Sequence, residues 1–481
     1  MERVVQDGLN ALEALGADYG EVRAERRTEE NVSIKNREVD GLSRRESQGV
    51  GIRVLHAGAW GFAATADTSK DGIARAARSA FAIAQATATV QRQRVDLAPE
   101  PAHQATFATP YTRDPLAVPL EEKLELMFSC AERILAVQGV AMAKGGIATW
   151  RVEKVFGNTT GSLIHQTLTS CGAGIEAYAA GAGEFQRRSY PCAFGGDYAS
   201  AGYEFIEKLD LLGHATQVGE EAVSLLTAPV CPTGVFDIVI GGSQMALQIH
   251  ESVGHPTELD RVLGTELSYA GGSFLSLDKK GAFRYGADIV SLVADATVPG
   301  GLGTFGYDDE GVPAQQVDLV KNGTFSGYLS SRDTVRAVGG RRSGGAARAS
   351  SWARIPLVRM TNINLLPGTG SLDDLIAGTE HGIYFETNKS WSIDDRRVNF
   401  QFGTEIAWEI QNGRKIRVLK NPLYTGITPQ FWGSCVAIAG PEAWHMWGVP
   451  NCGKGEPSQV MQVGHGTSPA KFAKVQVRGA G

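Results

Sequence analysis

The chain has 481 residues, about three times the ~150 of a typical domain, and 43% of its residues are apolar and 20% charged. That composition can build a sizeable core and excludes wholesale disorder. Glycine contributes 59 of the 481 residues, about 12% against roughly 7% on average, without the Gly-X-Y period of collagen. The formal net charge is −6 and no run of Lys and Arg could track phosphates, so nucleic acid is not an expected partner.

The first half of the chain alternates between helical and extended patterns. Apolar residues recur at helical spacing in four segments, which are residues 2–15, 69–90, 120–135 and 204–227. Short alternating runs in residues 19–64 and 147–195 predict strands, and the scattered glycines indicate tight turns between them. Five prolines between residues 99 and 119 predict an irregular surface crossing.

The main domain boundary is expected at the proline-containing connection 227–234, which separates residues 1–226 from residues 227–481. After this connection, the nearly continuous apolar run 235–240 predicts a buried strand, and two glycines lead into a helix. Beyond about residue 285, short strands and glycine turns dominate. We therefore expect an α+β protein with an N-terminal α/β domain and a β-rich C-terminal domain.

No segment predicts export or membrane insertion. Residues 1–7 are polar, and no window approaches the ~20 apolar residues of a membrane span. Six cysteines in a chain of this length are typical of reduced cytosolic thiols. These observations predict a cytoplasmic protein that contacts no membrane.

Two histidines flank a glutamate in His250-Glu251-x-x-x-His255, which is one residue longer than the familiar zinc-peptidase spacing. On a regular helix, positions i and i+5 lie ~140° apart, whereas positions i and i+4 lie ~40° apart. Both imidazoles can therefore reach one metal ion only if the helix contains a π-bulge or ends early. Gly254 is suited to permit either change, and Pro256 prevents a regular continuation.

This cluster predicts the chemistry of a metallopeptidase. Two neutral imidazoles and one further protein ligand would leave a fourth position for water, whose pKa the metal lowers. Glu251 would accept a proton from that water and pass it to the leaving amine. The spacing alone is equally compatible with chance proximity of polar residues at a helix end.

A third ligand must come from elsewhere in the chain. The candidates by residue type are Glu258, Glu310, Cys435, His445, Cys452 and His465. Cys452 lies in a polar, glycine-rich segment that predicts a loop, where Lys454 would lower the pKa of an exposed thiol. Cys435 lies in an apolar run and is expected to be packed, and His465 is also a candidate for stabilising an oxyanion.

Six sequence features in a fixed order carry a family resemblance. They are residues 47–54 with 58–63, and then residues 250–255, 308–313, 359–362, 382–384 and 451–454. On these features the chain resembles the TldD/PmbA family of metallopeptidases across nearly its whole length. The resemblance implies a two-domain TldD/PmbA-like architecture, with residues 1–226 serving dimerisation and as a lid and residues 227–481 carrying the metal.

The resemblance also implies a site and an activity. It implies Zn²⁺ bound by His250, His255 and Cys452, with Glu251 as the general base, and hydrolysis of unfolded or flexible peptides in a dimer. Because all four residues are present, the chain is similar to the zinc-bearing TldD type. Its dimer is either a homodimer or a heterodimer with a PmbA-type subunit. The alternative function is a non-catalytic partner or scaffold subunit of such a complex.

Two further segments have open interpretations. Asp308-Asp309-Glu310 predicts an acidic surface turn, although the family resemblance suggests a place near the active site. Residues 359–364 alternate like a strand, which is either an exposed edge that could pair with a peptide or an internal strand.

Overall fold

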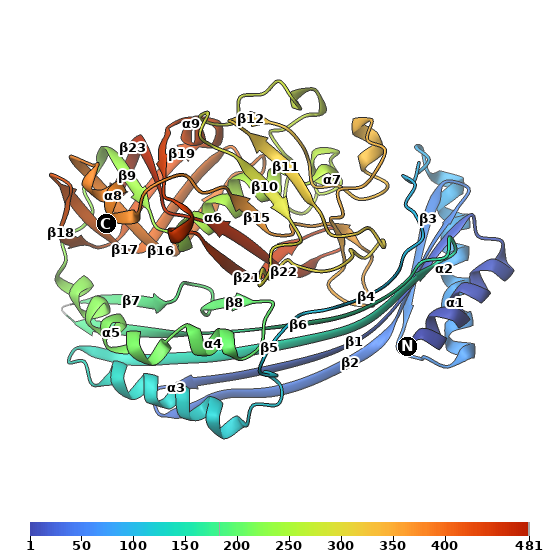
Figure 1. The fold of residues 1–481 in the computed structure, drawn as a ribbon, viewed down its shortest axis with the longest axis horizontal. Helices are drawn as coiled ribbons and strands as arrows, with labels where there is room; N and C mark the ends of the chain where they lie inside the picture. The colour runs from blue at the N-terminus through green and yellow to red at the C-terminus, as the bar shows by residue number, and fades with distance from the viewer. Residues whose placement is uncertain (182, 480–481) are drawn as a thin grey trace.

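The computed structural model describes residues 1–181 and 183–479. A long, curved N-terminal sheet forms a cradle, and a mixed C-terminal domain lies over its concave face (Figure 1). The N-terminal elements are α1 (Glu2–Leu15), β1 (Tyr19–Lys35), β2 (Glu38–His56), β3 (Ala59–Thr65), α2 (Lys70–Val90), β4 (Gln104–Ala108), α3 (Leu120–Leu135), β5 (Val140–Asn158), β6 (Leu163–Gly181), β7 (Glu184–Tyr190), β8 (Asp197–Ala199), α4 (Glu204–Lys208) and α5 (Leu211–Thr227). The predicted helices and strands of this half are present, except that residues 204–227 form two helices, α4 and α5, which are separated at Asp210 with its φ of 47°. The proline-rich crossing additionally contains β4.

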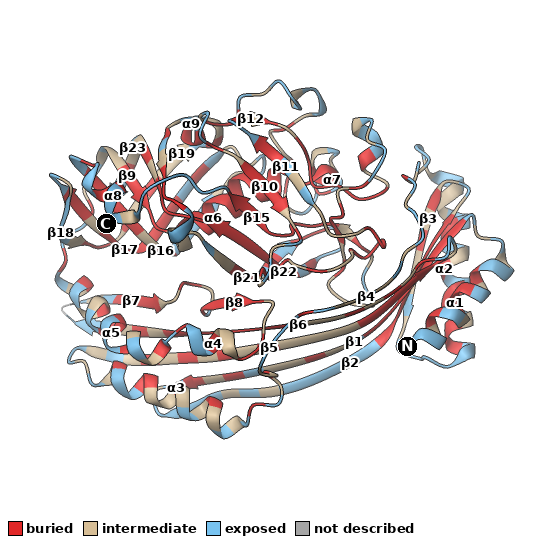
Figure 2. Ribbon diagram, in the orientation of Figure 1, coloured by how far each residue is buried: buried red, intermediate tan, exposed pale blue. Residues whose placement is uncertain are grey.

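The strand order of the N-terminal sheet is β3-β2-β1-β5-β6-β4, with β7 and β8 both paired to β6. The long strands pair antiparallel, and only β4 lies parallel to its neighbour β6. Residues 19–25 of β1 and 49–55 of β2 are buried without interruption (Figure 2). This burial arises because α1 and α2 cover one face of the sheet there, while the C-terminal domain covers the other.

The C-terminal domain is built around a buried helix, α6, that follows the predicted strand directly. Its elements are β9 (Gly234–Ile240), α6 (Gly242–Ile249), α7 (Leu259–Val262), β10 (Leu292–Asp295), β11 (Gln316–Lys321), β12 (Thr324–Phe325), β13 (Ala347–Arg348), β14 (Leu357–Val358), β15 (Ile363–Leu365), α8 (Leu372–Ala377), β16 (His381–Ile393), β17 (Asn399–Gln411), β18 (Arg414–Leu419), β19 (Pro422–Ile427), α9 (Thr428–Gly433), β20 (Cys435–Ile438), β21 (His445–Lys454), β22 (Gln459–Thr467) and β23 (Ala470–Gly479). The protein therefore has the mixed α+β character that was expected.

Three sheets surround α6. A seven-stranded sheet has the order β16-β9-β23-β19-β17-β18 with β20 on β23, a four-stranded sheet has the order β12-β11-β10-β15, and β21 and β22 form a hairpin. One large apolar core joins α6 to all three. All six cysteines are free thiols. Within the described residues, no helix combines the length and the apolar character that crossing a bilayer requires.

Buried ion pairs join the C-terminal domain to the N-terminal sheet. Lys154 on β5 donates to Asp309 at 2.7 Å, and Arg53 on β2 donates to Glu310 at 2.7 Å. The acidic segment Asp308-Asp309-Glu310 is buried, so the prediction of an acidic surface turn is wrong. Three successive acids usually face solvent, but here cations from strands far away in the sequence neutralise two of them.

The ionised form of Asp309 is expected to stabilise the contact between the domains. Burial alone would raise the pKa of its carboxyl group, but Lys154 and Arg23 lower that pKa to about 2. Because the pKa of an unfolded Asp is ~3.9, this shift contributes ~2–3 kcal/mol above about pH 5, and the contribution is lost progressively as the pH falls toward 2. Asp309→Asn should therefore lower the melting temperature at pH 7, and its difference from wild type should shrink below pH 4.

The exposed Asp40 provides a matched control, since Asp40→Asn should melt like the wild type at both pH values. Equal melting temperatures for Asp309→Asn and wild type at pH 7 would contradict the assignment of Asp309 to this contact.

Candidate metal centre

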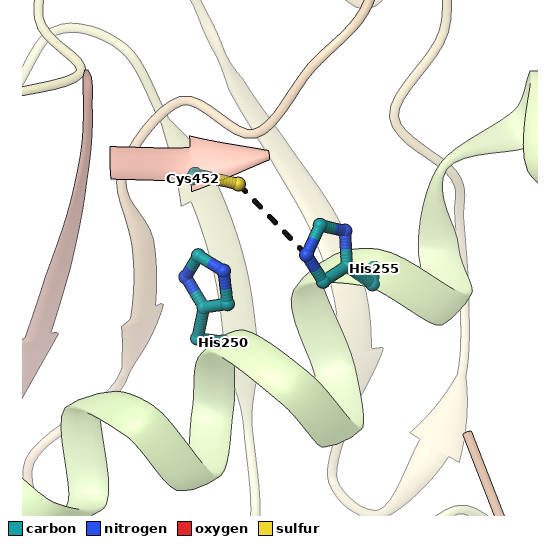
Figure 3. Close-up of side chains that lie close together, drawn as sticks. All are labelled: His250, His255 and Cys452. Atoms are coloured by element: carbon teal, nitrogen blue, oxygen red, sulfur yellow. Dashed lines mark hydrogen bonds between the residues drawn. The ribbon is translucent and has the colours of Figure 1, made fainter. Parts of the chain in front are cut away.

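His250, His255 and Cys452 lie together in the C-terminal domain (Figure 3). All three side chains are buried, and their ligand atoms lie within 4.8 Å of one another. The Sγ atom of Cys452 and the Nε2 atom of His255 are 3.8 Å apart. Donors around one tetrahedral zinc ion lie about 3.3–3.6 Å apart, given Zn–N bonds of about 2.0–2.1 Å and a Zn–S bond of about 2.3 Å. A small contraction of the three side chains would therefore suit one ion.

A change of helix type places the two histidines on the same side. α6 ends at Ile249, and residues His250–Gly254 form a π-helix in which the N–H of His255 donates to the carbonyl oxygen of His250. This i→i+5 bond widens the turn and offsets the five-residue spacing. The two imidazole rings consequently lie with their centroids 4.9 Å apart. Of the two changes that the spacing allows, a π-bulge or an early helix end, the structure contains the π-bulge.

Gly254 serves this turn in a way that the sequence does not reveal. Its backbone is ordinary right-handed helix, with φ of −57°, so another residue could adopt it. A Cβ atom at Gly254 would lie 2.2 Å from the Sδ atom of the buried Met360. Glycine is therefore needed here because a neighbouring segment packs closely against the helix, and not because the backbone requires unusual freedom.

Each histidine uses Nδ1 for a buried partner. Nδ1 of His255 lies 3.0 Å from Oε2 of Glu258, and Nδ1 of His250 lies 2.8 Å from Nε2 of His465. The carboxylate of Glu258 accepts from Nδ1–H of His255 and so fixes its tautomer, and both contacts leave the Nε2 atoms of the two histidines for a metal. Burial lowers the pKa of both His250 and His255, which favours the neutral imidazole that binds metal. Glu258 and His465, considered as third ligands, contact the histidines instead.

Cys452 lies on strand β21 and is buried, so the prediction of an exposed loop thiol is wrong. Burial would raise the pKa of this thiol, but His255 and Arg359 outweigh that effect and lower the pKa below its ordinary value. Arg359 also donates through Nη2 to the backbone oxygen of Cys452 at 2.5 Å. Lys454, which was expected to lower this pKa, instead donates to Asp260 at 2.7 Å.

Arg397 contacts the candidate base. Its Nη1 donates to Oε2 of Glu251 at 2.5 Å, and the Glu251 side chain is only 8% exposed. Arg397 lies between β16 and β17, 146 residues after Glu251, and no motif in the sequence marked it. Glu251 is the second residue of the π-helix, directly after the candidate ligand His250, and it is buried.

The remaining candidate ligands lie elsewhere. Glu310 pairs with Arg53, Cys435 is buried on β20, and His445 pairs with Asp197 at 2.7 Å. Residues 359–364 are also buried, and β15 within them pairs with β10. The exposed-edge interpretation is therefore wrong, because the whole segment is buried. Strand structure begins only at Ile363, where β15 forms the buried end of the four-stranded sheet.

Comparison with known proteins gives consistent matches along the chain. Residues 233–479 match the PmbA/TldA metallopeptidase C-terminal domain, residues 20–84 match PmbA/TldA metallopeptidase domain 1, and residues 113–228 match the PmbA/TldA metallopeptidase central domain. The first of these matches alone spans more than half of the 481 residues.

Individual relatives extend over almost the full length. A metalloprotease of Methanothermobacter thermautotrophicus is 29% identical over 462 residues, which is 96% of each chain. A metalloprotease TldD homolog of Buchnera aphidicola subsp. Acyrthosiphon pisum is 24% identical over 493 aligned positions, covering 98% of this chain and 96% of the relative. The crystal structure of TldE from Thermococcus kodakarensis shares the fold, with a TM-score of 0.72, 17% identity and complete coverage of both chains.

Gly254→Ala is expected to weaken metal binding, because the added methyl group would collide with Met360 and displace the turn that holds His255. The dissociation constant for Zn²⁺, measured by competition with a chelator, should rise at least tenfold. Gly453→Ala is a matched control beside Cys452, since among the described residues no atom lies within 4 Å of a Cβ built there. Equal affinities for the two variants would contradict this role of Gly254.

Removing a hydrogen-bond partner of a ligand should weaken the centre without removing a ligand. Loss of such a partner typically costs 10–100-fold in metal affinity, so His465→Ala and Glu258→Gln should each raise the Zn²⁺ dissociation constant by about that factor. His445→Ala removes a histidine that pairs outside the centre, and it should bind Zn²⁺ like the wild type. Wild-type affinity in both of the first two variants would show that these contacts do not orient the ligands.

Proposed function

We propose that this chain, which belongs to the PmbA/TldD family of metallopeptidases, is a TldD-type zinc peptidase that hydrolyses unfolded or flexible peptides. The observation that carries the proposal is the buried group of His250, His255 and Cys452 beside Glu251. Catalytic zinc sites characteristically have three protein ligands and an open fourth position. The family resemblance and the name metalloprotease of its relatives support the same activity.

The donor set favours zinc. Two imidazoles and one thiolate form a compact set of nitrogen and sulfur ligands, and zinc accepts both kinds in tetrahedral geometry. The lowered pKa of Cys452 favours the thiolate, and the lowered pKa values of the two histidines favour neutral rings. His250 Nε2, His255 Nε2 and Cys452 Sγ would hold the ion. When bound, the ion would lower the pKa of a water molecule and polarise the peptide carbonyl group.

The proton chemistry falls to Glu251. Its carboxylate would accept the proton that water loses during attack on the carbonyl carbon, and would then give that proton to the amine nitrogen as the C–N bond breaks. Burial of the surrounding side chains limits the access of bulk water, which strengthens the electrostatic interactions in the site.

The proposal also concerns assembly and location. We assign dimerisation and a lid function to residues 1–226, and the metal centre to residues 227–481. The partner would be a second copy or a PmbA-type subunit, and the fold shared with TldE is compatible with either. A cytoplasmic location remains the expectation for a chain with six free thiols. The alternative function, a non-catalytic scaffold subunit, has no need of the retained ligands and base.

Metal analysis combined with peptide cleavage tests the proposed activity. The wild type should contain about one zinc ion per chain and cleave an unstructured fluorogenic peptide. Glu251→Gln should keep its zinc but lose activity by a factor of about 10²–10⁴, the usual worth of a general base. Cys452→Ala should lose both.

Two outcomes would contradict the proposal, namely a zinc-free wild type or cleavage that is unaffected by Glu251→Gln. Cleavage that appears only after addition of a PmbA-type subunit would identify the active form as a heterodimer. Zinc binding without cleavage under either condition would support the scaffold function.

A further inference from the structure

Arg397 is held firmly beside Glu251. Its side chain is only 13% exposed, and its backbone adopts a φ of 65°, which is unfavourable for a residue other than glycine. Hydrogen bonds fix this conformation, because the Arg397 N–H donates to the carbonyl oxygen of Asp394 at 2.9 Å and the Arg397 carbonyl oxygen accepts from Thr428 Oγ1 at 2.7 Å. The surrounding structure therefore maintains an unfavourable backbone that directs a guanidinium group toward the base.

The contact with Glu251 does not satisfy every hydrogen-bond donor of this guanidinium group. The Nε atom of Arg397 is buried and has no hydrogen-bond partner among the residues that the structure describes. An unpaired buried donor is costly, and at an active site it is suited to a group that arrives with the substrate.

A contact with Glu251 alone does not explain Arg397. A cation stabilises the ionised carboxylate, which is the form of Glu251 before it accepts a proton. If Arg397 did nothing else, it would stabilise the ground state more than the transition state and would slow the reaction. The contact is useful for catalysis only if the same guanidinium group also stabilises the charge that appears after the proton has moved.

That charge appears on the carbonyl oxygen of the substrate. As the water oxygen bonds to the carbonyl carbon, a water proton passes to Glu251 and the C=O π electron pair moves onto the carbonyl oxygen. Glu251 becomes neutral while this oxygen becomes an oxyanion. We propose that Arg397 then donates to the oxyanion through its free N–H groups, and is therefore a catalytic residue; the inference rests on the proposed peptidase function.

The enzyme returns to its starting protonation state without any reactant other than water and the peptide. When the tetrahedral intermediate collapses, the C=O double bond re-forms, the C–N bond breaks, and the proton on Glu251 passes to the amine nitrogen. Glu251 is then a carboxylate again, and Arg397 resumes the contact seen at 2.5 Å.

Two other polar residues near the centre contact the candidate ligands and not Glu251. His465 shares a hydrogen bond with Nδ1 of His250, so it lies behind a candidate ligand. Arg359 is fully buried and donates through Nη2 to the backbone oxygen of Cys452, while its Nε and Nη1 atoms have no partner among the described residues. Of these three residues, Arg397 is the one that contacts Glu251, the candidate base.

The test compares Arg397→Ala with Arg396→Ala, which removes the same side chain from the exposed neighbouring position. Each zinc-loaded variant would be assayed for peptide cleavage and for binding of a phosphinic peptide, whose anionic tetrahedral group mimics the intermediate. Arg397→Ala should lower kcat about 10²–10³-fold, as for other oxyanion donors, and should weaken phosphinic peptide binding by a comparable factor. KM should change less than about threefold, because the substrate carries no oxyanion before reaction. Arg396→Ala should match the wild type in all three measurements.

A second variant distinguishes the loss of an oxyanion donor from a failure of the first variant to fold. Arg397→Lys keeps a cation near Glu251 but lacks the second donor of the guanidinium group, so its phosphinic peptide binding should also be weakened. Wild-type phosphinic peptide binding in Arg397→Lys, or in a folded Arg397→Ala, would overturn the inference and leave Arg397 as a residue that only positions Glu251. A wild type that neither cleaves peptides nor binds the phosphinic peptide would instead contradict the proposed peptidase function.

Discussion

The hydrogen bond from the N–H of His255 to the carbonyl oxygen of His250 is the interaction on which the site depends. A regular helix would direct residues five apart to different sides, and this single i→i+5 bond corrects the angle. The turn is not free to relax, since α6 is buried on all sides and Met360 packs directly against Gly254. The fold thus imposes an uncommon helical geometry at the one place where two imidazoles must converge.

The charges around this turn follow from its burial. A buried ion or ligand is stable only with a partner, and each group at the centre has one. Glu258 and His465 contact the histidines, Arg359 lies at Cys452, and Arg397 lies at Glu251. The two guanidinium groups therefore have different roles. Arg359 favours the thiolate form of the candidate ligand Cys452, whereas Arg397 contacts the candidate base Glu251.

Sequence reasoning predicted what depends on local periodicity. The helices at residues 2–15, 69–90 and 120–135 were found because their apolar faces pack locally, and the π-turn followed from the spacing of two histidines. Sequence reasoning failed where a residue's structure depends on contacts with residues far away in the sequence. The glycines around Cys452 predicted a loop, but pairing with β22 makes a strand, and Arg397 reaches Glu251 across 146 residues. The burial of Asp309 and Glu310 likewise depends on Lys154 and Arg53, which are too distant for any local pattern to reveal.

Other contacts between residues far apart in the sequence connect the N-terminal sheet to the metal centre. Arg23 on β1 donates to the backbone oxygens of Ser351 and Arg354 at 3.0 and 2.7 Å, and a Cβ atom at Gly51 would lie 2.4 Å from the backbone oxygen of Trp352. The sheet therefore fixes the start of a segment that continues through β14 to residues 359 and 360. Since Arg359 contacts Cys452 and Met360 packs against Gly254, the cradle formed by the N-terminal domain supports both the thiolate ligand and the π-turn. The geometry of the centre is consequently a property of the whole chain, and glycine at position 51 matters to it although that residue lies on a different sheet.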